Sequence, residues 1–238
     1  MNGIVAKTTR LAWIALLALT GLSFAQVSEG DRLVDAGDFA AAIAAYDTVI
    51  DANPNDARTL AQRARAQVYY ADNDASLDDA AREALYEAAL ADAERATELA
   101  PSNPDTWFEL SRALGRMAQY RGVLQSLNLA SRMSDALEQT LELDDAYAAA
   151  WHARALYHDE VPWIAGGRSG QVEPSFERAI EIEPDAITHR VAFAEVLIAR
   201  EAYDRAAEQL DAALALTATT YLQERDLEKA RSLQASLP

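Results

Sequence analysis

The sequence repeats one pattern along its length, and this repetition constrains the fold more than any other feature. Residues 37–56 read GDFAAAIAAYDTVIDANPND, and residues 201–220 read EAYDRAAEQLDAALALTATT. Two further endings of the same kind, ERATELAPSNPD and ERAIEIEPDA, lie between them. Repeats of this length are typical of helix pairs stacked in a row, not of one globular core. The pattern therefore predicts a binding surface, without identifying what is bound.

The repeats close at positions that are held mainly by proline. Pro54, Pro101, Asp145, Pro184 and Ala218 occupy these positions, so the intervals are 47, 44, 39 and 34 residues. Proline after a helix stops it and turns the chain. Half of the residues are hydrophobic and alanine dominates that set, which suits close contact between helices. The longer intervals predict long second helices, one from Ser76 to Ala100 and another from about Gly122 to Leu143.

The pattern resembles the tetratricopeptide repeat (TPR) family, whose 34-residue unit is a helix–turn–helix. Gly30, Ala42 and Tyr46 fill the Gly, Ala and Phe positions of the first unit. Trp107 and Trp151 both stand six residues after a closing position, where the family has tryptophan. The resemblance covers nearly all of the chain after the first 25 residues.

This resemblance implies an all-α fold, a right-handed α-solenoid of about five TPR-like helix–turn–helix pairs. We expect the solenoid to span residues 26–220. Residues 221–238 read as an amphipathic helix that caps the last pair.

The first 25 residues have the organisation of a signal peptide. Lys7 and Arg10 precede an apolar run, and Ser23-Phe24-Ala25 matches a cleavage site, so the mature chain is predicted to begin at Gln26. The pattern predicts an exported protein, periplasmic or extracellular, with no membrane span after cleavage. The alternative is an uncleaved membrane anchor. The chain has no cysteine, so disulfides do not contribute to its stability.

The most loop-like stretch of the mature chain is VPWIAGG, residues 161–167. Its proline and two glycines resemble an element of exported TPR proteins associated with TRAP-type solute transporters, and of the microtubule-dynamics regulator group. In the transporter-associated group the helices are thought to enclose a ligand pore. The alternative is a plain connector, with Trp163 plugging the solenoid.

Five oxygen-bearing residues follow the ligand spacing of an EF-hand loop, namely Asp72, Asp74, Ser76, Asp78 and Glu83. Leu77 stands where that loop needs glycine. The favoured interpretation is a helix start, with Ser76 as the N-cap and Asp79 completing a capping box. We therefore predict no metal site here.

No catalytic arrangement is evident. His152, His158 and His189 are the only histidines, and none has HExxH spacing. His152 and His158 are six residues apart, so on one helix they face different directions. There is no G-x-S-x-G turn and no cysteine nucleophile. The sequence predicts a protein that is not an enzyme and that needs no cofactor or metal.

In resembling proteins the first helix of each pair lines a concave groove, which makes this groove the predicted binding surface. The candidate groove residues are Arg58, Arg65, Tyr69, Phe108, Arg112, Arg116, His152 and Glu195. An arginine cluster beside aromatic rings suits a carboxylate or an acidic peptide. The alternative is that these arginines pair with neighbouring acids, because the net charge is −17. That charge also disfavours nucleic acid as a partner.

Two functions follow from this surface. The first is an exported scaffold or adaptor that binds a protein or peptide partner in an open groove. The alternative is a ligand-binding accessory of a periplasmic solute transport system, with a small acidic ligand held between helices. An open, continuous groove favours the first function, and a closed channel with buried polar residues favours the second.

Overall fold

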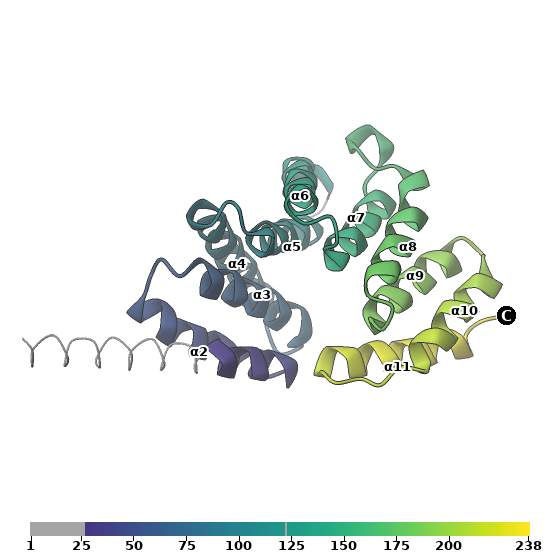
Figure 1. The fold of residues 1–238 in the computed structure, drawn as a ribbon, viewed down its shortest axis with the longest axis horizontal. Helices are drawn as coiled ribbons and strands as arrows, with labels where there is room; N and C mark the ends of the chain where they lie inside the picture. The colour runs from purple at the N-terminus through teal and green to yellow at the C-terminus, as the bar shows by residue number, and fades with distance from the viewer. Residues whose placement is uncertain (1–26, 122) are drawn as a thin grey trace, which may run out of the picture.

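The computed structural model describes residues 27–121 and 123–238 (Figure 1). The predicted signal peptide and its cleavage point lie outside the described residues. Among the described residues the regular structure is helical, without strands, which confirms the all-α solenoid. No helix in this part of the chain is long and apolar enough to cross a membrane.

The helices follow one another in pairs. The chain forms helix 27–35, α2 (Phe39–Ala52), α3 (Ala57–Asn73), α4 (Asp79–Leu99), α5 (Pro104–Arg121), α6 (Val123–Leu143), α7 (Ala148–Glu160), η1 (Trp163–Ala165), η2 (Ser169–Gln171), α8 (Val172–Ile182), α9 (Ile187–Ala199), α10 (Tyr203–Leu214) and α11 (Tyr221–Ala235). Five pairs and a terminal helix result, as the repeat pattern predicts. The two long second helices, α4 and α6, each have 21 residues.

Acidic residues begin several of these helices. Asp56 accepts a hydrogen bond from the Thr59 amide at 3.0 Å. The prediction of Ser76 as the cap of α4 is wrong, because Asp78 accepts from the Ala81 amide at 2.8 Å and the helix begins at Asp79. The Ser76 hydroxyl and amide instead donate to the loop carboxylate of Asp74, at 2.6 and 2.8 Å.

Small residues allow the helices of a pair to approach each other. A Cβ added at Gly30 would lie 2.3 Å from the Tyr46 ring, so only glycine fits beneath that buried tyrosine. Ala42 is fully buried in the same cluster. The glycine and aromatic positions of the repeat are thus two sides of one contact.

The terminal helix α11 joins the two ends of the solenoid (Figure 1). On one side Leu227 and Ala230 are buried in the core formed by α9 and α10. On the other side Tyr221 packs edge-on against Phe39 of the first pair, with ring centroids 6.0 Å apart. Arg225 also donates to the Asn73 side chain at 2.6 Å. The stacked pairs therefore close into a ring.

Candidate ligand cavity at the centre of the ring

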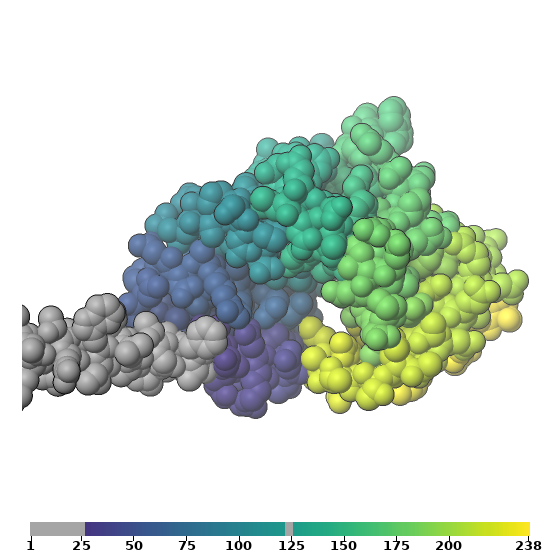
Figure 2. All heavy atoms as spheres, in the orientation of Figure 1, coloured from purple at the N-terminus to yellow at the C-terminus, as the bar shows by residue number. Residues whose placement is uncertain are grey.

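The centre of the ring contains a cavity of about 510 Å³. Its walls come from α3, α5, α6, α7 and α9, and α11 contributes Gln223. In the space-filling view an opening lies between yellow-green α11 and the purple-to-blue helices at the N-terminal end (Figure 2). The concave face of the solenoid is thus a partly open central cavity.

The structure places five of the eight candidate groove residues on the cavity wall, namely Tyr69, Phe108, Arg112, Arg116 and His152. The other three are not among the lining residues. Arg65 is half-buried and pairs with Asp31 at 3.2 Å, while Glu195 pairs with Lys229 at 2.6 Å. Arg58 stands near the start of the same helix, α3, and is not among the lining residues.

Arg112 is held in place on three sides. Its guanidinium carbon lies 4.8 Å from the Phe108 ring centre and 5.1 Å from that of Tyr69. Its Nε donates to the buried Glu109 carboxylate at 2.8 Å. Burial alone would lower the pKa of Arg112, but the negative charge of Glu109 outweighs it and raises the pKa. The guanidinium stays charged, and its charge is compensated within its own helix.

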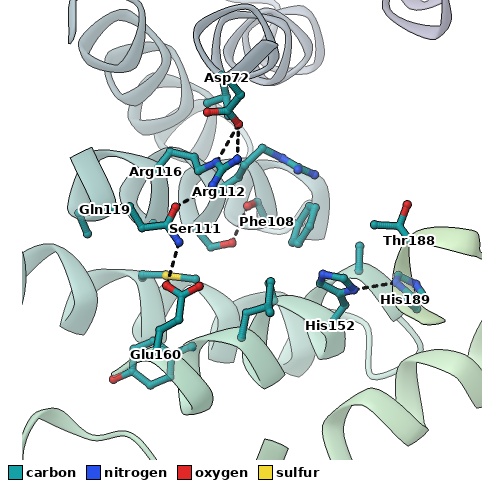
Figure 3. A pocket seen from close by; sticks show the side chains of 18 of the residues that line it. Asp72, Phe108, Ser111, Arg112, Arg116, Gln119, His152, Glu160, Thr188 and His189 are labelled. Atoms are coloured by element: carbon teal, nitrogen blue, oxygen red, sulfur yellow. Dashed lines mark hydrogen bonds and ion pairs between the residues drawn. The ribbon is translucent and has the colours of Figure 1, made fainter. Parts of the chain in front are cut away.

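Arg116 belongs to a polar chain that crosses the cavity wall (Figure 3). It forms an ion pair with Asp72 of α3 at 2.5 Å and donates to the Gln119 side chain at 2.7 Å. Gln119 in turn donates to Glu160 of α7 at 2.8 Å. Both arginines that line the cavity, Arg112 and Arg116, are therefore paired with an acid. This is the alternative to a ligand-binding arginine cluster.

His152 and His189 meet at the cavity wall, a juxtaposition absent from the predictions. Their Nδ1 atoms are 3.0 Å apart (Figure 3). The Nε2 of His189 faces a Glu183 carboxylate oxygen at 3.5 Å. Both residues stand on first helices of consecutive pairs, α7 and α9, and neighbouring first helices line one face. This register is the sequence signal for the pairing, and spacing along a single helix does not reveal it.

Burial lowers the pKa of both histidines. The positive charge of Arg112 lowers the pKa of His152 further, as would a proton on His189. Glu183 acts in the opposite direction on His189 without reversing the shift. Both rings are therefore neutral near pH 7.

His158 points to a different place. It is buried beside a separate small cavity of about 140 Å³, which Arg154 and Arg168 also line. Its neighbour Asp159 pairs with Arg200 at 2.8 Å. Within the described residues no three His, Cys, Asp or Glu side chains gather in a geometry that could hold a metal ion.

The VPWIAGG loop leaves the ring at its outer side. Trp163 is 84% exposed and Ile164 is 80% exposed, so the alternative in which Trp163 plugs the solenoid is wrong. Gly166 has a φ of 103°, which favours glycine. A Cβ at Gly167 would collide with the Val161 carbonyl oxygen. The two glycines thus allow the tight turn of this loop, in which the side chains of Trp163 and Ile164 are exposed.

Comparison with known proteins gives one family and a set of similar folds. The family model for regulator of microtubule dynamics protein 1-3 matches residues 26–163, more than half of the chain. No curated protein matches the sequence.

Among solved structures, the thermophilic TPR protein TTC0263 of Thermus thermophilus is 20% identical, with a TM-score of 0.72. The alignment covers 90% of this chain and 97% of that one. MamA 41-end from Desulfovibrio magneticus RS-1 is 15% identical over 88% of this chain and 96% of its own, with a TM-score of 0.51. At these identities the likeness establishes the TPR fold alone. The resemblance to transporter-associated proteins stays a prediction.

Proposed function

The chain belongs to the regulator of microtubule dynamics protein 1-3 family, and we propose that it is a TPR-fold binding module that holds a small, mainly apolar ligand in its central cavity. The contact between Tyr221 and Phe39 carries this proposal, because it closes the ring around the concave face and leaves a partly open central cavity in place of a continuous groove. The cavity volume of about 510 Å³ lies within the range of small-molecule sites.

Ring closure argues against an extended protein partner in the groove. A stable protein interface needs roughly 800 Å² of surface from each partner. The contact of α11 with the first pair interrupts the continuous concave surface that such a partner would cover. The site is better suited to a molecule that enters the ring.

The lining favours an apolar, uncharged ligand. Val68, Phe108, Ala130, Met133 and Leu156 supply apolar contacts on the cavity wall. An acidic ligand would have to compete with the carboxylates that already pair with the two lining arginines. The acidic-ligand hypothesis therefore loses its electrostatic basis. The five lining candidates become proposed ligand contacts, with the arginines acting through their aliphatic stems.

Binding of an uncharged fluorescent probe tests the proposal. N-phenyl-1-naphthylamine should bind the full chain saturably, at one molecule per chain. Ala153, which lines the cavity, offers a blocking variant: Ala153→Phe should abolish probe binding. The matched control is Ala84→Phe on the exposed face of α4, which should bind as the wild type does. Equal binding by wild type and Ala153→Phe would contradict the proposal.

A second candidate function is protein docking through the outer loop. Trp163 and Ile164 form an exposed apolar pair, and exposed tryptophan is typical of interface anchors. This surface would serve the scaffold or adaptor role without using the cavity. Replacing both residues with serine should abolish capture of a protein partner while leaving probe binding unchanged. Capture that persists would exclude the loop as the docking site.

We further propose that the chain is exported. The proposal rests on the sequence of residues 1–25 alone. N-terminal sequencing of the protein from expressing cells should begin at Gln26. An intact N-terminus in a membrane fraction would support the anchor instead.

A further inference from the structure

We propose that Glu183, His189 and His152 form a proton-ordered relay that makes His152 present a bare Nε2 lone pair to the central cavity. The ligand would then carry a hydrogen-bond donor, a hydroxyl or an N–H group, at that point. The ligand part of this inference rests on the proposed function of the cavity, whereas the relay itself is a property of the protein.

The relay starts from the geometry of the two rings. The Nδ1 atoms of His152 and His189 are 3.0 Å apart, which is a hydrogen-bonding distance. Only one of the two nitrogens can carry the shared proton, because a neutral imidazole has one N–H and one bare nitrogen. The shared proton is on the Nδ1 of either His152 or His189. In the first case the Nε2 of His152 is bare, and in the second it carries a proton.

Glu183 distinguishes between them. Its carboxylate oxygen lies 3.5 Å from the Nε2 of His189, an ion-pair contact without hydrogen-bond geometry, so it acts on that nitrogen through its charge. That negative charge favours a proton on Nε2 of His189. The Nδ1 of His189 is then bare and accepts from the Nδ1–H of His152. The Nε2 of His152 consequently has no proton.

Burial is the main reason that both rings stay neutral, and the positive charges nearby act in the same direction. Arg112 of α5 faces His152, and Arg190 of α9 lies near His189; both positive charges disfavour a second proton on either ring. Glu183 is the acid that faces the pair. The orientation of the relay thus depends on one carboxylate.

The bare nitrogen belongs to a residue on the cavity wall. His152 is half-buried, and its ring stands edge-on to Phe176 with centroids 5.5 Å apart. Within the described part of the chain, its hydrogen bond to His189 uses Nδ1 and leaves Nε2 without a protein partner. A ligand hydroxyl or N–H would satisfy this lone pair, whereas a carboxylate would be repelled by it.

The tautomers can be measured without any ligand. With ¹⁵N-labelled histidine in the full chain at pH 7.5, long-range ¹H–¹⁵N spectra should show His152 protonated at Nδ1 and His189 at Nε2. In Glu183→Ala the two arrangements should mix. The matched control is Glu181→Ala, whose carboxylate pairs with Arg178, and it should leave both tautomers unchanged. A wild-type His152 protonated at Nε2, or a Glu183→Ala spectrum identical to wild type, would overturn the relay.

Two matched probes then test the ligand class. 1-Naphthol should bind roughly tenfold more tightly than 1-methoxynaphthalene, which corresponds to about 1.4 kcal/mol. The difference should disappear in His152→Phe, which keeps an aromatic ring. Equal affinities of the two probes for the wild type would refute the donor requirement while leaving the cavity proposal intact. Failure of both probes to bind would count against the cavity, and the spectra would still report on the relay.

Discussion

The contact that closes the ring can be tested by a double-mutant cycle. Phe39 and Tyr221 stand at opposite ends of the described chain, and their rings are 6.0 Å apart in an edge-on arrangement. Such an aromatic pair contributes about 0.5–1.5 kcal/mol beyond the area that it buries. The variants are Phe39→Leu, Tyr221→Leu and the combination. If the ring is closed in solution, the double variant should lose about 1 kcal/mol less than the sum of the single losses.

Urea unfolding at pH 7.5, followed by circular dichroism, measures the four free energies of unfolding. A control cycle combines Phe39→Leu with Tyr203→Leu, a change at an exposed tyrosine of α10. The coupling energy between Phe39 and Tyr203 should be near zero. Equal coupling energies in the two cycles, or a coupling within about 0.3 kcal/mol of zero for Phe39 and Tyr221, would refute closure. An open solenoid would follow, and with it the groove-binding scaffold as the better function.

Three further predictions concern stability. The pKa of His152 is lowered, so below about pH 6.5 the folded state binds fewer protons than the unfolded state, and the free energy of unfolding should fall on acidification by up to about 1.4 kcal/mol per pH unit. His152→Phe should flatten the plot of this free energy, measured with urea, between pH 7.5 and 5.5. An unchanged slope would exclude His152 as the source of the pH dependence. Asp92→Ala removes two 2.7 Å hydrogen bonds from Arg63 and leaves it, within the described residues, only its 2.6 Å contact with Asp47. The free energy of unfolding should drop by about 2–3 kcal/mol, and a loss below about 1 would mean that Asp47 alone compensates the Arg63 charge. Gly37→Ala places a Cβ at a φ of 81° and 2.5 Å from the Tyr221 ring. It should lower the free energy of unfolding by about 1–2 kcal/mol more than Gly170→Ala, whose Cβ meets no atom within 4 Å. Equal losses in thermal or urea unfolding would contradict both the turn at Gly37 and the closure of the ring.

The helix pairs could be predicted from the sequence because each pair is a local unit. Pro54 and the other closing residues end helices within a few residues of their own position. The Gly30–Tyr46 contact lies within one repeat, so the pattern and the packing coincide. The N-cap of α4 was missed because Ser76 and Asp78 are equally good caps. The choice between them depends on Asp74, whose carboxylate uses the serine for its own loop.

The ring could not be predicted in this way. Closure depends on the rotation accumulated over several pairs, and small differences at each interface add up. The pairing of His152 with His189 depends on the same rotation between α7 and α9. Contacts between residues far apart in sequence, such as Arg225 with Asn73, leave no periodic trace.

The cavity arginines illustrate how context changes the meaning of a sequence pattern. In a chain with a net charge of −17, a cluster of arginines on one surface stands out as a site for an acid. The fold uses those charges differently: Arg112 compensates the buried Glu109, and Arg116 joins α3 to α5 through Asp72. Removing one member of such a pair leaves an uncompensated charge, so an acidic ligand gains little by displacing it. The groups left to select a ligand are the apolar wall, which favours an uncharged molecule, and His152, which favours one that donates a hydrogen bond.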